Sequence, residues 1–346
     1  MEPLNRRSIA FLTHLKKVAD KALSKIPFSL SNLRFSSGQP NFPEQINWLA
    51  SPIKSLLQTQ RQWTTLECGI NTGRQIFFHL SSPHRDTPKL REKLVNRVQK
   101  CCAWLSMATA YAESRCSENM HIYMFFTDAK KMLPIKKGLT IDTEHANTAF
   151  TTSCQTDTSI LLYREEEWFK VFIHETFHNL GLDFSSQNIT PVKKALVQHF
   201  KIRSDMRIYE SYCEVWADIL NVLFTRDQDW IQAIEAERQY SLKQAGKIFQ
   251  HFGLTYADLG TTKATSAFNE NTEIFCYFVV RSLWMWGLNR FLTWCLTHNN
   301  GSLRFQGDVK QFVQHMIFAQ NPTQAYLHAV RPLDQASRSL RMTLYG

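Results

Sequence analysis

The chain has 346 residues and a formal net charge of +10, and 44% of its residues are hydrophobic. This length is sufficient for two lobes with cores of their own, and the apolar content excludes a largely disordered chain. The positive balance favours an anionic partner, such as nucleic acid or an acidic protein, without identifying one.

The N-terminal segment, residues 5–28, predicts a basic amphipathic helix. Its apolar residues recur at helical spacing between lysines and arginines: Ile9, Leu12, Leu15, Val18 and Leu23. Such a helix is either a packing arm with a solvated face or a contact to nucleic acid or an acidic protein surface. We assign residues 1–60 to this arm and a linker, and residues 36–45 have the composition of the linker itself.

Residues 61–204 predict a lobe that contains a sheet. The expected elements are, in order, a strand at 74–82, a long helix at 88–114, a strand at 120–128, one or two strands within 136–154, a short extended piece at 159–164 and a strong helix at 164–180. The last strand within 136–154 is rich in threonine and suits a sheet edge. The acidic first turn of the last helix suits the helix dipole, and Gly181 is a stop signal.

Residues 205–346 predict a mainly helical lobe. Helices are expected at 205–226, 229–253, 270–298 and 307–319. The most apolar stretch, residues 274–296, is interrupted by Arg281, Asn289 and Arg290, so we expect a buried or amphipathic helix and no membrane span. The whole pattern predicts the α+β class.

Cysteine usage and the N-terminus bear on the compartment. The eight cysteines, at positions 68, 101, 102, 116, 154, 213, 276 and 295, include no C-x-x-C pair. We therefore expect reduced thiols in a cytosol-like compartment. We also expect no classical signal peptide, because no apolar segment with a small-residue cleavage site is seen at the N-terminus.

The five residues HETFH, 174–178, carry the chemistry. A helix turns about 100° per residue, so His174 and His178 lie about 40° apart and about one turn along the axis. Both imidazoles can reach one zinc ion, while Glu175 is rotated away from them, as a general base for water requires. The alternative is a helix with two ordinary histidines.

A catalytic zinc ion takes three protein ligands, so a third ligand must follow. In one arrangement the chain turns at Gly181 and returns a ligand three residues later. Phe184 occupies that position, however, and Asp183 stands one residue early. Asp183 is therefore a candidate ligand, and its alternative role is a loop cap or an acceptor behind the ligands.

The other source of a third ligand is the later helix, where Glu210, Glu214 and Asp218 share one face. Three carboxylates inside an otherwise apolar helix are costly unless a cation receives them. We predict Glu214 as the ligand and Glu210 as its substitute or as a supporting group. We predict that Asp218 accepts the outer N–H of a ligand histidine. The alternative is a solvated acidic stripe.

The motifs HETFH and ESYCEVWAD, 174–178 and 210–218, together resemble those of the glutamate-zincin metallopeptidases, the class of thermolysin and neprilysin. The resemblance implies a mixed sheet with an active-site helix, an edge strand that binds the substrate backbone, and a mainly helical second lobe. It implies His174, His178 and Glu214 as zinc ligands, Glu175 as the base and Asp218 behind the ligands. The 35 residues between His178 and Glu214 leave room for an inserted loop.

Two further segments extend this resemblance. Residues 147–150 are similar to the Asn-Ala edge segment of the family with one residue inserted, which implies Asn147 and Ala149 in substrate binding. The longer segment HETFHNLGLDFS looks like those of predicted zinc peptidases encoded by large DNA viruses. This similarity implies a cytoplasmic or virion-associated location.

The same class implies a donor for the oxyanion of the tetrahedral intermediate. Glu273, Tyr277 and Arg281 fall on one face of the predicted helix at 270–298, which makes Tyr277 or Arg281 the oxyanion partner. His251 and Tyr256 are further candidates. The alternative is an ordinary buried pair of Arg281 and Glu273 with a core tyrosine.

We therefore expect a zinc metallopeptidase that acts on a polypeptide substrate. One alternative is a non-catalytic structural or interaction protein with the zincin fold, such as a virion component. Its basic arm and residues 331–346 would dock a partner. Another alternative is nucleic-acid binding, which predicts a contiguous basic face and an affinity that falls steeply with salt.

Overall fold

The structure is a computed structural model, and it describes residues 1–25, 33–319, 322–332 and 337–346. The chain divides into two compact units. The sheet unit comprises residues 16–130 and 147–182 with Gly346, and the helical unit comprises residues 1–15, 131–146 and 183–345.

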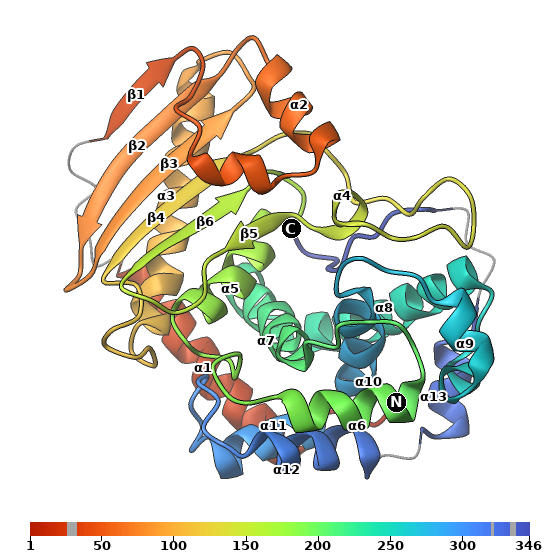
Figure 1. The fold of residues 1–346 in the computed structure, drawn as a ribbon. Helices are drawn as coiled ribbons and strands as arrows, with labels where there is room; N and C mark the ends of the chain where they lie inside the picture. The colour runs from red at the N-terminus through yellow and green to blue at the C-terminus, as the bar shows by residue number, and fades with distance from the viewer. Residues whose placement is uncertain (26–32, 320–321, 333–336) are drawn as a thin grey trace. The chain divides into compact units, whose positions relative to one another are not determined.

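The sheet unit is built on one mixed sheet of six strands (Figure 1). The strands are β1 (Arg34–Ser37), β2 (Thr64–Asn71), β3 (Gln75–Ser82), β4 (Asn119–Phe125), β5 (Ala149–Thr151) and β6 (Asp157–Leu162). Their order is β1-β2-β3-β4-β6-β5. β4 runs parallel to both β3 and β6, and the remaining pairs are antiparallel. β5 is thus an edge strand, as predicted from its threonines.

Two layers of helix cover the sheet. Alternate strand residues, among them Phe78, Ile122 and Ile160, are fully buried on the face that α3 (Pro88–Ala108) and α5 (Trp168–Asn179) cover. On the other face, η1 (Glu44–Trp48) and α2 (Ser51–Thr59) bury Ile53 and Leu57 against Leu161. Burial therefore alternates along the first half of these strands, where one face is open, and is continuous toward their C-terminal ends, where both faces are covered.

The predicted elements of the sheet unit are largely confirmed, with shifted ends. The strands expected at 74–82, 120–128 and 159–164 are β3, β4 and β6, and the long helix is α3. The interpretation of residues 36–45 as a linker was wrong in part, because β1 begins at Arg34 and η1 at Glu44. β1 forms by pairing with the distant β2, which a local pattern does not reveal, whereas β2 was missed although it forms a hairpin with the adjacent β3.

The helical unit contains short and long helices around one central helix, α7. In chain order they are α4 (Thr143–Ala146), α6 (Thr190–Phe200), α7 (Ile208–Thr225), α8 (Trp230–Phe252), η2 (Tyr256–Gly260), α9 (Thr262–Ala267), η3 (Phe275–Val280), α10 (Arg281–Trp286), α11 (Leu288–His298), α12 (Val309–Val313), η4 (Gln314–Phe318) and α13 (Gln324–Ala329). Every residue from 210 to 224 is buried, so α7 is surrounded, with α8, η3 and α10 against it. The α+β class is thereby confirmed.

Two predicted helices of this unit are discontinuous. The helix expected at 270–298 consists of the π-helical turn η3 followed by α10 and α11, with Gly287 between the last two. The helix expected at 307–319 likewise divides into α12 and the π-helical η4. A π-turn adds a residue to the turn, so positions four apart no longer share a face.

Helix α1 (Arg6–Ser24) confirms the predicted amphipathic helix. Its first half packs within the helical unit, where the ring of Phe11 lies 6.0 Å from Trp216 and the backbone N–H of Asn5 donates to Asn289. Arg6, Arg7, Lys17 and Lys21 are exposed, whereas Lys16 is buried and pairs with Asp20. Within the described ranges, every helix is too short or too polar to cross a lipid bilayer.

A fully buried ion pair joins α7 to α10. Arg281 Nε donates to Asp218 Oδ2 at 2.5 Å, and both side chains are 0% exposed. Burial lowers the pKa of Arg281, but Asp218 and Glu214 more than offset this and raise it above its ordinary value. The guanidinium also donates to the carbonyl of Met342, which ties the C-terminal segment to this pair.

We predict that Arg281→Met lowers the free energy of unfolding by about 3–5 kcal/mol, because it leaves Asp218 buried without its cation. The double variant Asp218→Asn/Arg281→Met removes both charges and should recover much of this loss. Urea unfolding curves measure both changes. If Arg281→Met were as stable as the parent chain, the result would contradict the buried ion pair of Arg281 with Asp218.

Candidate metal centre

Helix α5 carries the predicted histidine pair and is enclosed over most of its length. All residues from Phe169 to Asn179 are buried. The helix follows Glu167, whose φ is 61°, and Gly181 beyond its end has φ 64°, so the predicted stop is confirmed. The expected acidic first turn is wrong: the glutamates at 165–167 precede the helix, and Glu165 pairs with Lys93 instead.

The rotation of α5 about its axis is determined by helix α3. Trp104 Nε1 donates to Thr176 Oγ1 at 2.7 Å, and the Trp104 ring stacks on Phe177 with centroids 6.1 Å apart. Thr176 lies about 160–200° around the helix from His174 and His178. Because Thr176 faces α3, the two histidines point away from it.

The two imidazoles converge. His174 Nε2 and His178 Nε2 lie 3.3 Å apart, and the rings meet at 75°. Two ligands at about 2.05 Å from an ion in tetrahedral geometry stand about 3.3 Å apart, so the pair fits zinc. The same spacing accommodates one N–H···N hydrogen bond between neutral rings, which is the alternative of two ordinary histidines.

Glu175 lies near the end of β6. Burial raises the pKa of Tyr163 to about 12, and the charge of Glu175 adds to this effect. The Tyr163 hydroxyl donates to the carbonyl of Asn147 at 2.7 Å, and Arg164 Nε donates to the same oxygen at 2.9 Å. The backbone that leads into β5 at Ala149 is therefore held by the strand end that adjoins Glu175.

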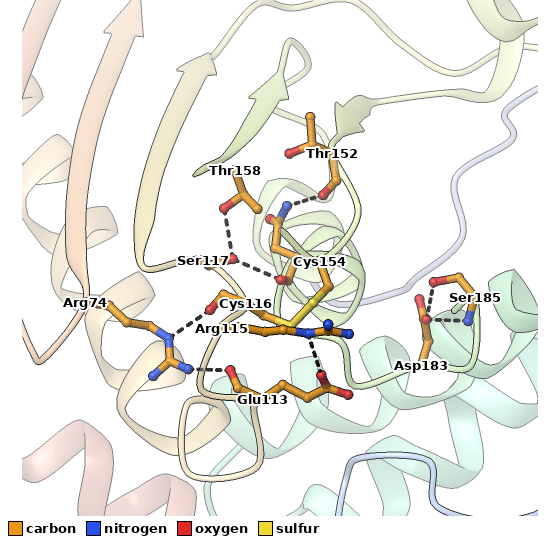
Figure 2. The surroundings of a disulfide bond; sticks show 11 residues. Arg74, Glu113, Arg115, Cys116, Ser117, Thr152, Cys154, Thr158, Asp183 and Ser185 are labelled. Atoms are coloured by element: carbon orange, nitrogen blue, oxygen red, sulfur yellow. Dashed lines mark hydrogen bonds and ion pairs between the residues drawn. A yellow bond between two sulfur atoms is a disulfide. The ribbon is translucent and has the colours of Figure 1, made fainter. Parts of the chain in front are cut away.

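The C-terminal end of α5 is fastened to neighbouring loops (Figure 2). Ser117 Oγ donates to the carbonyl of Asn179 at 2.9 Å and accepts from Thr158 at 2.8 Å. Next to Ser117, Cys116 forms a disulfide with Cys154 (Figure 2). Together these contacts prevent α5 from fraying at the end that carries His178.

The disulfide corrects the prediction that all cysteines are reduced. Folding brings Cys116 and Cys154, 38 residues apart in sequence, to a Cα–Cα distance of 4.8 Å. No local spacing in the sequence indicates this pairing. The remaining six cysteines form no disulfide and are buried: Cys68, Cys101, Cys102, Cys213, Cys276 and Cys295.

The acidic face of α7 is buried, so its interpretation as a solvated stripe is wrong. Glu210, Glu214 and Asp218 are 8%, 5% and 0% exposed. Asp218 is paired with Arg281, whose pKa Glu214 also helps to raise. Glu273 is buried near Glu210, and burial followed by the Glu210 charge raises its pKa to about 7. Negative charge thus accumulates toward the N-terminal end of the face.

Asp183 has the role of a loop cap. Its Oδ1 accepts from the backbone N–H of Ser185 at 2.8 Å and from the Ser185 hydroxyl at 2.6 Å. The Cys213 thiol lies 3.6 Å from the other carboxylate oxygen. Phe184, which occupies the position of the compact third ligand, is fully buried, with its ring 4.6 Å from that of Phe305.

Among the candidate donors to the oxyanion, Arg281 forms an ion pair with a residue that the sequence analysis did not predict as its partner. The sequence paired it with Glu273 or with the active site, whereas the structure pairs it with Asp218. Glu273 accepts from the backbone N–H of Arg207 at 3.1 Å. The π-turn η3 lies between these positions and changes their register. Tyr277 lies within this turn and is half-buried.

His251 and Tyr256, the further candidates for the oxyanion donor, make contacts within the interior of the helical unit. His251 Nε2 lies 2.7 Å from the carbonyl oxygen of Leu139, and burial lowers its pKa. Tyr256 is packed edge-on against Tyr326, with ring centroids 5.4 Å apart, and burial raises its pKa. Both side chains contribute to the interior of the helical unit.

The predicted site residues thus fall into two groups. The sheet unit holds His174, Glu175 and His178 with the edge segment, and the helical unit holds the carboxylates and Tyr277. Comparison with protein-family models, curated proteins and solved structures found no match for the chain. Sequence reasoning missed Trp104, Ser117 and the disulfide, which support α5.

We predict that Cys116→Ser/Cys154→Ser lowers the free energy of unfolding of the sheet unit by about 4 kcal/mol, because the disulfide restricts the unfolded chain. Urea unfolding with and without reductant measures the change, and the variant serves as the reductant-insensitive control. Thiol titration of the unreduced, denatured chain should find the six cysteines that form no disulfide. Eight titratable thiols would contradict the pairing.

Proposed function

We propose that the chain is a zinc-dependent metallopeptidase. The observation that carries this proposal is the pair of buried imidazoles on α5, whose Nε2 atoms lie 3.3 Å apart with Glu175 next to the first of them. That spacing matches two ligands of one tetrahedral ion. When bound, zinc supplies a Lewis acid that polarises a carbonyl group and makes water more acidic.

The proposed ligands are His174, His178 and a carboxylate of α7. Glu214 is the first choice and Glu210 its substitute. Both are buried in a helix that is otherwise mainly apolar, and zinc accepts carboxylate oxygen ligands. Asp218 pairs with Arg281 and is therefore placed behind the ligands.

The roles of the remaining residues follow from their positions. Glu175 accepts the proton of the attacking water and passes it to the leaving amine. The substrate backbone pairs with the edge of β5, beside Asn147 and Ala149, as an added antiparallel strand. Tyr277 donates to the developing oxyanion, since its phenol is half-buried whereas Arg281 is occupied within the interior.

We predict that Glu175→Gln reduces peptide hydrolysis by at least about a hundredfold and leaves the zinc content near one ion per chain, because the amide cannot accept the proton. The chain is purified with zinc, its metal is measured by mass spectrometry, and cleavage of denatured casein is followed. His174→Ala should lose both zinc and activity, whereas the exposed His14→Ala should lose neither.

Three outcomes distinguish the proposal from its alternatives. Unchanged hydrolysis in Glu175→Gln would refute the role of the base. A parent chain that binds zinc through His174 but cleaves no peptide would favour the non-catalytic interaction protein. Zinc content that is insensitive to His174→Ala would refute the metal site itself. The exposed Glu118→Gln is the matched control for a lost carboxylate.

A further inference from the structure

A basic stripe on α3 borders a cavity in the sheet unit that the proposed peptidase chemistry does not use. The cavity has a volume of about 380 Å³ and is lined by Lys89, Glu92, Lys93, Asn96, Arg97, Lys100 and Trp168. Steps of three or four residues place the four cations on one helix face. The volume falls within the range of about 300–1,000 Å³ that small-molecule sites occupy.

The charges at this cavity do not balance. Glu165 pairs with both Lys93 and Arg97, and Glu92 is the one acidic residue of the lining. Among the described residues, no carboxylate forms an ion pair with Lys89 or Lys100. The lining cations Lys89, Lys93, Arg97 and Lys100 outnumber Glu92 and Glu165, and Asp128, within 4.8 Å of the Glu165 carboxylate, reduces the remaining excess of positive charge.

Lys100 is a partly buried cation that packs on an aromatic ring. Its ammonium lies 4.1 Å from the centroid of the Phe169 ring, and burial lowers its pKa to about 8. A partly buried ammonium without a counter-charge is destabilised, and an anion at this position would restore the lost solvation. The nearby thiol of Cys101 is fully buried, and its pKa is raised by burial, so it does not provide that charge.

One wall of the cavity is a fixed aromatic and guanidinium surface. The Arg97 guanidinium lies 3.7 Å from the centroid of the Phe126 ring and 5.4 Å from that of Trp168. Trp168, at the start of α5, is only half-buried. Its ring, together with the methylene stems of the lysines, offers a planar apolar surface beside the cations.

We propose that this cavity binds a nucleoside monophosphate, with the phosphate at Lys89, Lys93 and Lys100 and the base against Trp168. A phosphate monoester carries a charge of about −1.5 to −2 at pH 7, which is complementary to the excess of positive charge in the lining. Flexible ammonium groups bind phosphate as point charges, and an aromatic ring stacks on a base of any sequence.

The test is isothermal titration calorimetry of the full chain with adenosine 5′-monophosphate. We expect saturable binding of one nucleotide per chain, weakened about tenfold or more by Lys100→Met and by Lys89→Met, because each change removes a charge-assisted contact. Methionine retains the apolar stem of the lysine. The exposed Lys194→Met on α6 should bind as the parent chain does.

Parallel titrations separate the two parts of the ligand. Ribose 5-phosphate should bind at the same site more weakly, because it lacks the base, and adenosine should not bind measurably. The proposal is overturned if the nucleotide does not saturate the chain, if the two cavity variants bind as tightly as Lys194→Met, or if only a single-stranded oligonucleotide binds. Neither lysine belongs to the proposed peptidase site. A failure of the peptidase proposal would therefore not change the nucleotide binding expected here.

Discussion

The rotation of α5 about its own axis is the constraint on which the proposed chemistry depends. Trp104 holds Thr176 through one hydrogen bond, and this contact directs the opposite side of the helix away from α3. A rotation by one residue would turn both imidazoles by about 100° about the helix axis and point the pair toward different surroundings. The contacts of Ser117 with Asn179 then hold the end of the helix that bears His178.

Buried charge is the second constraint, and the charge environment of the carboxylates differs between the two ends of α7. Asp218 is matched by Arg281, a pair with no solvent contact. Toward the other end of α7, the pKa of Glu273 is raised to about 7 by burial and then by the charge of Glu210. Repulsion between these two carboxylates disfavours the charged form of Glu273, while Arg207 favours it.

The sequence predicted the parts of the molecule that depend on local patterns. Apolar runs located β3, β4 and β6, and helical periodicity located α3, α5 and α7. The same periodicity placed His174 and His178 on one side of a helix, and the structure brings their Nε2 atoms within 3.3 Å. Gly181 and Gly253, both with φ 64°, end their helices as predicted.

Most features that were missed depend on partners distant in the chain. β1 pairs with the distant β2, and the Cys116–Cys154 bridge spans 38 residues without a local signature. β2 is an exception, because it forms a hairpin with the adjacent β3. The partner of Arg281 was also missed, because π-turn η3 shifts the register after Glu273. Tertiary packing determines these pairings, and the periodicity of a single sequence does not predict them.

The central claim is that His174 and His178 bind one zinc ion together with an oxygen ligand. Zinc K-edge X-ray absorption of the metal-loaded chain tests this claim most directly. The account predicts two imidazole nitrogens at about 2.0–2.1 Å, a remaining shell of oxygen and no sulfur. A spectrum with sulfur at about 2.3 Å, or one unchanged in His178→Ala, would contradict it.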